Sequence, residues 1–391
     1  MAFKKDWVSG NKGEWSELYA FYYLMGDPRL FAADEKLDRT GDFLPILSAF
    51  RSDSMGVEHE YIISDDRVTI SVEEGELLLD SFSANEFSTM ASTLLKRLEN
   101  YKAIEYEDGK KHFPPIHELD DFMSKSHTDR LKAKSTEKKD IQFKVDDTRN
   151  ARKPIVGFSI KSYLGQNPTL FNVGKNTNFR FRVTDCTDEI RTEVNSKKGL
   201  KKKIACLFEK GCDLSFDRMM SDRFRMNLEL IDSNMDSLIA EVIRRMWKDG
   251  NEKISDIVES ISKDDPLKKK NRHFYEYKMK QFLSSVALGM LPETEWDGKD
   301  QANGGYIIVK RDGDVVCYFL YNRNEFNDYL FNCTKIEKPD TERHDYGNIL
   351  KDENGFYIDL DPQIRFLLPT SQSDNAVGIR QSTLDCYKEE R

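Results

Sequence analysis

Hydrophobic positions near the start of the chain recur with the period of an amphipathic helix. The large side chains there fall at i, i+3, i+4 and i+7: Trp15, Leu18, Tyr19 and Tyr22. Ser9 and Asn11 are both suitable caps for a helix that begins at this point. The pattern therefore predicts a helix over residues 10–25, whose polar face carries Glu14 and Glu17.

Two β-type segments in the middle of the chain are separated by a turn. Residues 141–145 (IQFKV) precede the turn-like sequence DDTRNARK, and residues 154–162 (PIVGFSIKS) follow it. These features predict a hairpin. Earlier in the chain, the strand-like segments EYIIS and RVTISV, around Tyr61 and Thr69, precede a helical pattern over residues 83–100.

Helical periodicity dominates the next part of the chain, and β-type patterns return near its end. After a predicted strand over residues 178–183, hydrophobic side chains from Met220 to Met246 recur near a 3.6-residue period, which predicts a long helix. Further helices are predicted over residues 254–261 and 274–288. The late β-type segments are GGYIIVK, VVCYFLY, FYIDLD and QIRFLL, the first two flanking a predicted turn at Asp312-Gly313.

Composition indicates a folded protein without a membrane span. The 391 residues include 24 Phe and 16 Tyr, which argues against disorder. No apolar run approaches the roughly 18 residues that a spanning helix needs, so we expect no membrane association and a cytoplasmic location. The six cysteines lie far apart, which signals neither a disulfide framework nor a zinc site.

Charge is distributed unevenly along the chain. Residues 131–203 contain 18 Lys and Arg against 8 Asp and Glu, a local net charge of +10 in a chain whose overall net charge is −9. Such an asymmetry suggests one electropositive surface for a polyanion, although an ordinary solvated patch is an alternative.

The predicted hairpin brings together residues that could carry chemistry. If its strands pair antiparallel, Asp140 at the start of the first lies beside Lys161 near the end of the second. Strand alternation puts Ser159 and Lys161 on the same face. A carboxylate beside a lysine suits phosphodiester hydrolysis with a divalent cation, for which we expect Mg²⁺. The pattern is that of D…(E)xK nucleases, with Ser159 in the usual acidic position, although it also arises by chance.

A second carboxylate should complete the metal site, because Ser159 replaces the usual acid. Glu14 or Glu17 of the first helix is the natural supplier, and we prefer Glu14 as the metal ligand beside Asp140. Both glutamates are alternatively surface residues near a helix N-terminus, where negative charge is favoured.

Amide and basic side chains follow the hairpin and could contact DNA. Asn and Gln can hydrogen-bond adenine edges or phosphates, and Lys binds phosphates. We expect DNA contacts from Ser162, Gln166, Asn172, Lys175, Asn176 and Asn178. Loop and turn formation is the alternative role for each of the amides.

Longer blocks of sequence resemble a known family. GFSIKSYLGQNPTLFNVGKNTNF (residues 157–179) and GNKGEWSELY (residues 10–19) resemble the HpaII family of type II restriction endonucleases. The resemblance continues, in the expected order, through ALGMLPETEWDGKDQANGGYIIVKRDG, YLFNCT, the Arg343-His344 pair and QIRF.

The resemblance implies an enzyme that cuts double-stranded DNA at a short palindrome, CCGG in the family's namesake, with magnesium and a protective partner methyltransferase. It implies that Asp140, Ser159 and Lys161 occupy the nuclease motif. It marks Gln301 and Asn303 as part of a family block near the DNA. Contacts with bases are expected from Arg343 and His344, for which a structural pair is the alternative. A palindrome favours a homodimer, although monomers also read short palindromes.

The expected fold is α/β: a restriction-endonuclease-like PD-(D/E)xK core, in which helices flank a mixed sheet that carries the hairpin. We expect an N-terminal helix and nuclease core in residues 1–190, a mostly helical region in 191–290, a β-rich DNA-recognition region in 291–368 and a tail in 369–391. The alternatives are a repair-type or modification-dependent nuclease of the same fold and a DNA-binding protein that has lost catalysis.

Overall fold

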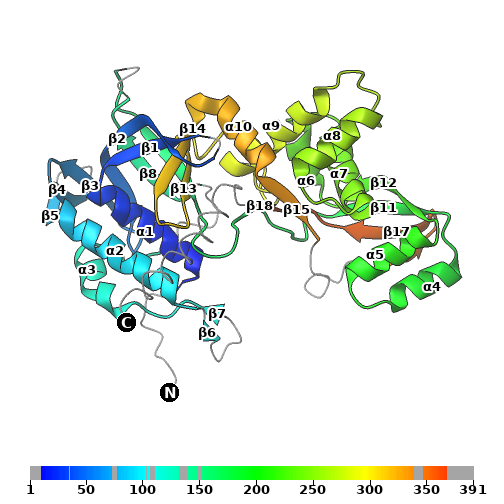
Figure 1. Cartoon of the computed structure of the whole chain (residues 1–391), viewed down its shortest axis with the longest axis horizontal. Coiled ribbons are helices and arrows are strands. Elements are labelled where there is room, and N and C mark those ends of the chain that lie inside the picture. The colour runs from blue at the N-terminus through cyan, green and yellow to red at the C-terminus, as the bar shows by residue number, and fades with distance from the viewer. Residues whose placement is uncertain are drawn as a thin grey trace, which may run out of the picture. The chain divides into compact units, whose positions relative to one another are not determined.

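The chain forms two compact units, each built from segments that are separate in sequence (Figure 1). Unit 1 contains Met1–Pro168, Gln301–Phe326 and Leu368–Arg391, and unit 2 contains Thr169–Asp300 and Asn327–Leu367. The expected regions with boundaries at 190, 290 and 368 follow chain order, whereas the units interleave. The computed structural model describes residues 10–34, 36–72, 77–102, 104–105, 111–131, 139–147, 151–338 and 347–367.

Unit 1 is organised around a nine-stranded mixed sheet with the strand order β1-β14-β13-β9-β8-β2-β3-β4-β5. Because β1 also pairs with β2, six of these strands form a closed circuit. The sheet strands are β1 (Arg29–Ala33), β2 (Arg39–Ser52), β3 (Glu58–Ser64), β4 (Arg67–Val72), β5 (Leu77–Ser83), β8 (Ile141–Val145), β9 (Ile155–Ser162), β13 (Gly305–Val309) and β14 (Val315–Phe319). The expectation of an α/β fold with a mixed sheet that carries the hairpin is confirmed.

The remaining elements of unit 1 are helices and one short ribbon. They are α1 (Lys12–Gly26), α2 (Ala84–Asn100), α3 (Asp120–Lys125), the 3₁₀ helices η2 (His117–Leu119) and η3 (Leu320–Asn322), and the pair β6 (Ile104–Glu105) and β7 (Lys111–His112). α1 and α2 lie side by side, and α1 also packs on β9 (Figure 1). Aromatic rings of α1, α2 and α3 pack against one another, with the ring centroid of Phe122 in α3 5.4 Å from that of Tyr22 in α1 and 5.1 Å from that of Phe87 in α2.

The predicted first helix is confirmed, and its start has a clear local cause. The Asn11 side chain accepts a hydrogen bond from the Glu14 backbone N–H, and the Glu14 carboxylate accepts one from the Asn11 N–H. This capping box satisfies two backbone donors that would otherwise lack partners. Trp15, Leu18 and Tyr22 are buried as the periodicity predicts. Most side chains of α1 are thus buried among apolar neighbours, and Glu17 lies between buried residues of the same helix.

The predicted hairpin is confirmed at β8 and β9, which pair antiparallel with Ile141 opposite Phe158. On its other side, β9 pairs parallel with β13, which places Ser159 opposite Tyr306. β9 is thus an interior strand with both edges hydrogen-bonded, a placement that the local sequence pattern does not reveal.

Glycines allow β13 and the loop before it to approach β9. The Gly304 N–H donates to the Gly157 carbonyl at 2.7 Å, and the Gly157 N–H donates to Asn303 Oδ1 at 2.8 Å. A Cβ at Gly304 would lie 2.6 Å from the Phe158 ring, and one at Gly305 would lie 2.1 Å from the Tyr318 carbonyl oxygen. Gly305 also has a φ of +141°, which side chains disfavour. The close approach therefore depends on the absence of side chains.

Unit 2 combines two small sheets with a group of helices. The sheets have the strand orders β12-β11-β17-β16 and β10-β18-β15. Their strands are β10 (Thr169–Phe171), β11 (Phe179–Thr184), β12 (Asp213–Met219), β15 (Thr334–Glu337), β16 (Leu350–Asp352), β17 (Gly355–Leu360) and β18 (Gln363–Phe366). The helices are α4 (Asp188–Ser196), α5 (Leu200–Glu209), α6 (Asp222–Glu229), α7 (Met235–Asp249), α8 (Ile254–Asp264), α9 (Phe274–Leu288) and α10 (Arg323–Asn332), whose first residues belong to unit 1.

The prediction of one long helix from Met220 to Met246 is wrong. The segment forms α6 and α7, which are separate helices, and Met220 precedes both of them. Asp232 ends the periodic run, because its Oδ1 accepts a hydrogen bond from the Asn234 backbone N–H at 2.9 Å. This local side-chain contact offers the backbone an alternative to helix. α6 and α7 each bury one apolar face, so hydrophobic residues recur at helical spacing on both sides of Asp232 and hide the break between the two helices.

We predict that Gly305→Ala strongly destabilises the protein, whereas Gly41→Ala in β2 does not. Alanine at 305 would overlap a carbonyl oxygen of β14 and favour a different φ, which should cost about 3 kcal/mol or more in unfolding free energy. No atom lies within 4 Å of a Cβ at Gly41. Urea denaturation of both variants measures the difference, and equal stabilities would contradict the described packing of β13.

Candidate active site

Asp140 lies at the entrance to β8 and points across the end of β9. Its backbone N–H donates to the Phe158 carbonyl at 2.8 Å, which extends the hairpin by one rung. Its Oδ2 accepts hydrogen bonds from the Ile160 backbone N–H at 2.6 Å and from Ser159 Oγ at 3.1 Å. The carboxylate thus occupies a position that a strand carbonyl would fill, which fixes its orientation. The predicted proximity of Asp140 to the end of β9 is confirmed.

Lys161 lies two residues beyond Ser159 on the same strand face. Its Nζ is 5.9 Å from the centroid of the Tyr306 ring. Burial alone would lower the pKa of Lys161, but the neighbouring Tyr306, Asp140 and Glu17 outweigh burial, so the pKa is raised. Lys161 is therefore a cation at neutral pH, enclosed beside two carboxylates.

Glu17 reaches the same place from α1. Burial is the largest cause that raises its pKa, to about 8, and the Asp140 carboxylate raises it further. Arg51 of β2 and Lys161 act in the opposite direction. Since the net shift is upward, Glu17 is largely protonated at neutral pH when no further cation is present. Two carboxylates that resist being charged together are a suitable pair for a divalent cation, whose charge would relieve the repulsion.

Glu14 has a different role in the structure. Its carboxylate accepts the Asn11 N–H at 2.8 Å and closes the capping box of α1. Among the groups that shift the pKa of Glu17, Glu14 comes last, after Asp140, Arg51 and Lys161. The choice of Glu14 as metal ligand therefore stays a prediction, and Glu17 is the glutamate whose pKa Asp140 and Lys161 shift.

Sequence reasoning did not identify Tyr306 and Arg51 as members of this site. Tyr306 is buried, and a hydrogen bond joins its hydroxyl to Ser159. Arg51 places its Cζ 5.3 Å from the Phe21 ring and donates from Nη2 to the Arg130 carbonyl at 2.6 Å. Both residues reach the site through a pairing that is distant in sequence, β13 with β9 for Tyr306 and β2 with β8 for Arg51. Tyr306 of β13 lies opposite Ser159 of β9, and this contact can be predicted only if the register of the β9–β13 pairing is known.

The residues predicted to contact DNA fall in both units. Ser162 and Gln166 belong to unit 1, and so do Gln301 and Asn303 in the loop that packs on Gly157. Unit 2 holds Asn172, Lys175, Asn176 and Asn178. Gln166, Asn172, Lys175, Gln301 and Asn303 are exposed, whereas Asn178 is buried beside β11. Arg343 and His344 lie outside the described residues.

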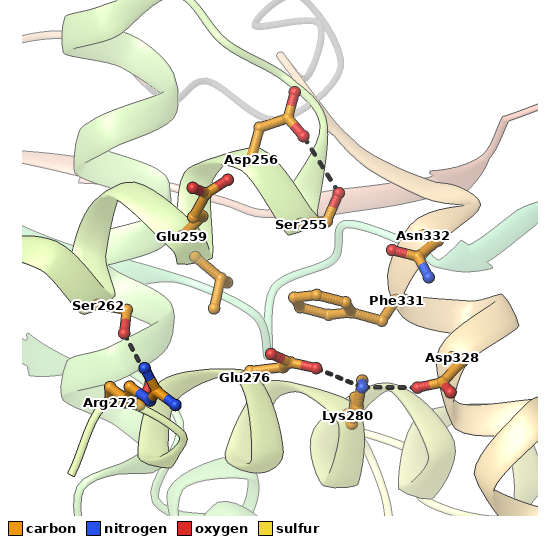
Figure 2. Close-up of a pocket in the computed structure, with 11 residues that line it drawn as sticks. Ser255, Asp256, Glu259, Ser262, Arg272, Glu276, Lys280, Asp328, Phe331 and Asn332 are labelled. Carbon is orange, nitrogen blue, oxygen red and sulfur yellow. Dashed lines mark hydrogen bonds and ion pairs between the residues drawn. The ribbon is translucent and has the colours of Figure 1, made fainter.

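Two surface pockets contain none of the predicted site residues. One, of about 580 Å³, lies in unit 1 between α1, α2 and the β13–β14 turn. The other, of about 590 Å³, lies in unit 2 between α8, α9 and α10 (Figure 2). In the second, Lys280 is paired with Glu276 and Asp328, and further carboxylates line the wall. The lining of this pocket carries more carboxylates than cations, which does not favour phosphate binding there.

Comparison with known proteins identifies the family. The family model described as HpaII restriction endonuclease matches residues 11–366. The chain belongs to this family. The type II restriction enzyme HpaII of Haemophilus parainfluenzae is 38% identical over 367 residues, which cover 93% of the chain and 99% of that enzyme. No solved structure matches the chain.

Membership of the HpaII restriction endonuclease family confirms several of the sequence-based expectations. The chain is a type II site-specific deoxyribonuclease, its substrate is DNA, and the family implies a divalent metal. The donor set of the hairpin site fits such an ion, because Asp140 and Glu17 are carboxylates held together in a desolvated place. Within the described residues, no helix has both the length and the apolar character needed to cross a bilayer.

We predict that Glu17→Gln stabilises the metal-free protein increasingly as the pH rises. In the folded chain Glu17 keeps its proton up to about pH 8, whereas its ordinary pKa is 4.5. The unfolded wild type therefore binds fewer protons than the folded one across this interval, and its stability falls with increasing pH. Glutamine does not titrate.

The difference in unfolding free energy between E17Q and wild type should thus grow between about pH 4.5 and about pH 8 and stay constant below that interval. Denaturant titrations in EDTA measure this difference, with the exposed Glu99→Gln as control. A difference independent of pH would contradict the burial of Glu17 beside Asp140.

Proposed function

We propose that the chain hydrolyses both strands of DNA at a short palindrome, CCGG or a close relative of it, with Mg²⁺. The active site that we propose consists of Asp140, Ser159, Lys161 and Glu17 within a PD-(D/E)xK-type core. The observation that supports this most strongly is the position of Asp140, whose carboxylate is hydrogen-bonded to Ser159 and to the Ile160 N–H next to Lys161 and is the charged group that most raises the pKa of Glu17.

Asp140 and Glu17 would hold the divalent ion. Bound there, it would lower the pKa of a water molecule and neutralise charge on the phosphate. Glu17 must lose its proton for this role, and Lys161 and Arg51 both favour that loss. Glu14, the ligand preferred from sequence, stays a prediction, with its Oε2 in the capping box of α1.

Lys161 acts through its charge rather than as a base. Because its pKa is raised, the ammonium group stays protonated at neutral pH and cannot accept a proton from water. It can donate hydrogen bonds to the attacking hydroxide or to a phosphate oxygen and stabilise the charge that develops there. Its Nζ lies over the ring of Tyr306, 5.9 Å from the centroid.

Ser159 replaces the usual acid without leaving the site incomplete. Its hydroxyl donates to Asp140 Oδ2 at 3.1 Å, so it orients that carboxylate instead of adding a third negative charge. The missing acid is supplied by Glu17 from α1. Ser159 orients Asp140 and Glu17 supplies the second carboxylate, so a motif with serine in the acidic position can still bind the metal ion.

DNA recognition would use residues of both units. We propose that the exposed side chains of Gln166, Asn172, Lys175, Gln301 and Asn303 contact the substrate, together with Ser162, Asn176, Asn178, Arg343 and His344. A homodimer matches the two-fold symmetry of a palindrome. A cytoplasmic location and a methyltransferase that modifies the same site complete the proposed restriction system.

We predict that Lys161→Ala lowers the cleavage rate at least about 100-fold while DNA affinity changes little, because the lost charge acts on the transition state. Lys144→Ala, which removes a lysine from the adjacent strand β8, is the matched control and should cleave normally. Single-turnover cleavage and gel shifts of a CCGG duplex measure the two effects. Wild-type cleavage by K161A would refute the site.

We also predict that unmethylated plasmid is cut into discrete fragments whose ends share one palindrome, and that EDTA stops the reaction. Sequencing of the fragment ends reveals the site and the stagger. Cleavage only of methylated DNA would favour the modification-dependent alternative, and binding without cleavage would favour the non-catalytic one.

A further inference from the structure

A second group of potential metal ligands lies in unit 1, on residues that the proposed catalysis does not use. Asp53 follows the end of β2, His59 lies in β3, and His127 follows α3. One carboxylate oxygen and one nitrogen from each imidazole all lie within 4.8 Å of one another. Three segments of the chain therefore converge on one point.

Asp53 and His59 are buried, His127 is half-buried, and the hydrogen bonding of the group is incomplete. Asp53 is 4% exposed and His59 is 2% exposed. Asp53 Oδ2 lies 3.0 Å from His59 Nε2, and the rings of His59 and His127 stack with centroids 4.5 Å apart. His59 Nδ1 is fully buried and has no hydrogen-bond partner among the described residues. Because Nε2 is the nitrogen that faces Asp53, Nδ1 lies on the opposite side of the imidazole ring, and Nε2 is the nitrogen placed to bind an ion together with the Asp53 carboxylate.

The surrounding backbone holds these side chains in place. Asp53 Oδ1 accepts hydrogen bonds from the backbone N–H groups of Met55 and Val57, both at 2.9 Å, which leaves Oδ2 turned to His59. His127 has a φ of +53°, a conformation that few residues other than glycine adopt. Tyr61 Oη donates to the His127 carbonyl at 3.1 Å and helps to fix this conformation.

We propose that Asp53, His59 and His127 bind a transition-metal dication of the Zn²⁺ class. Two imidazoles and one carboxylate are a ligand set that suits Zn²⁺, whereas Mg²⁺ prefers oxygen donors only. The fourth position would be filled by water. This site is independent of the proposed catalytic site, whose donors are carboxylates.

The bound ion would join the β2–β3 turn to the segment that follows α3. The same segment supplies the Arg130 carbonyl that accepts a hydrogen bond from Arg51, the neighbour of Glu17. Loss of the ion should therefore weaken the hydrogen bond that holds Arg51 and lower the unfolding free energy. Any effect on the cleavage rate should follow from this loss of stability.

The test measures zinc directly in protein produced without a histidine tag. Wild type, equilibrated with Zn²⁺ and then dialysed, should retain one zinc per chain by mass spectrometry, and Zn²⁺ should raise its Tm in a concentration-dependent manner. His127→Asn removes the imidazole while asparagine still tolerates positive φ. This variant should lose more than about 100-fold in zinc affinity, because removing a group that only orients a metal ligand already costs about 10–100-fold.

The control His117→Asn removes an exposed imidazole that lies 2.9 Å from the Asp120 carboxylate, outside the site, and should bind zinc like wild type. E17Q should do so as well, which separates this site from the catalytic one. Wild-type protein that retains no zinc would overturn the proposal, whatever the variants do. So would H127N binding zinc with wild-type affinity.

Discussion

The architecture of unit 1 depends on enclosing a lysine ammonium beside two carboxylates at the end of an interior strand. Lys161 is brought there by β9, Asp140 by the start of β8 and Glu17 by α1. Lys161 and Asp140 carry opposite charges there, whereas burial and the Asp140 carboxylate disfavour the charged form of Glu17, which stays largely protonated until a further cation binds. The raised pKa values of Glu17 and Lys161 are two consequences of this arrangement.

Precise packing of the backbone makes the enclosure possible. Asp140 replaces a strand carbonyl at the Ile160 N–H, and Gly304 and Gly305 allow β13 to approach β9 closely enough for Tyr306 to face Ser159. On the helical side, the capping box fixes where α1 begins and hence which of its side chains faces the strand. The positions of the charged side chains thus depend on backbone hydrogen bonds and on glycines, which are themselves uncharged.

Contacts between residues close in sequence could be predicted from the sequence, whereas contacts between segments far apart along the chain could not. The hairpin and its Asp140–Lys161 pair followed from two strands joined by a short turn. The pairing of β9 with β13 did not, because periodicity carries no information about a partner far along the chain. Glu14 and Glu17 lie three residues apart on one helix, and the cap formed by Glu14 with Asn11 follows a sequence signature that the prediction did not use. The break before α7 was hidden because both flanking helices bury hydrophobic side chains at the same spacing.

The most direct test of the account is the position of Mn²⁺, used in place of Mg²⁺, in crystals of the protein with its DNA site. Anomalous diffraction locates the ion without assumptions about the chemistry. The account predicts an ion bound by the carboxylates of Asp140 and Glu17, with Lys161 beside the same phosphate. An ion at the scissile phosphate that is held by other residues, with Glu17 turned away, would contradict it.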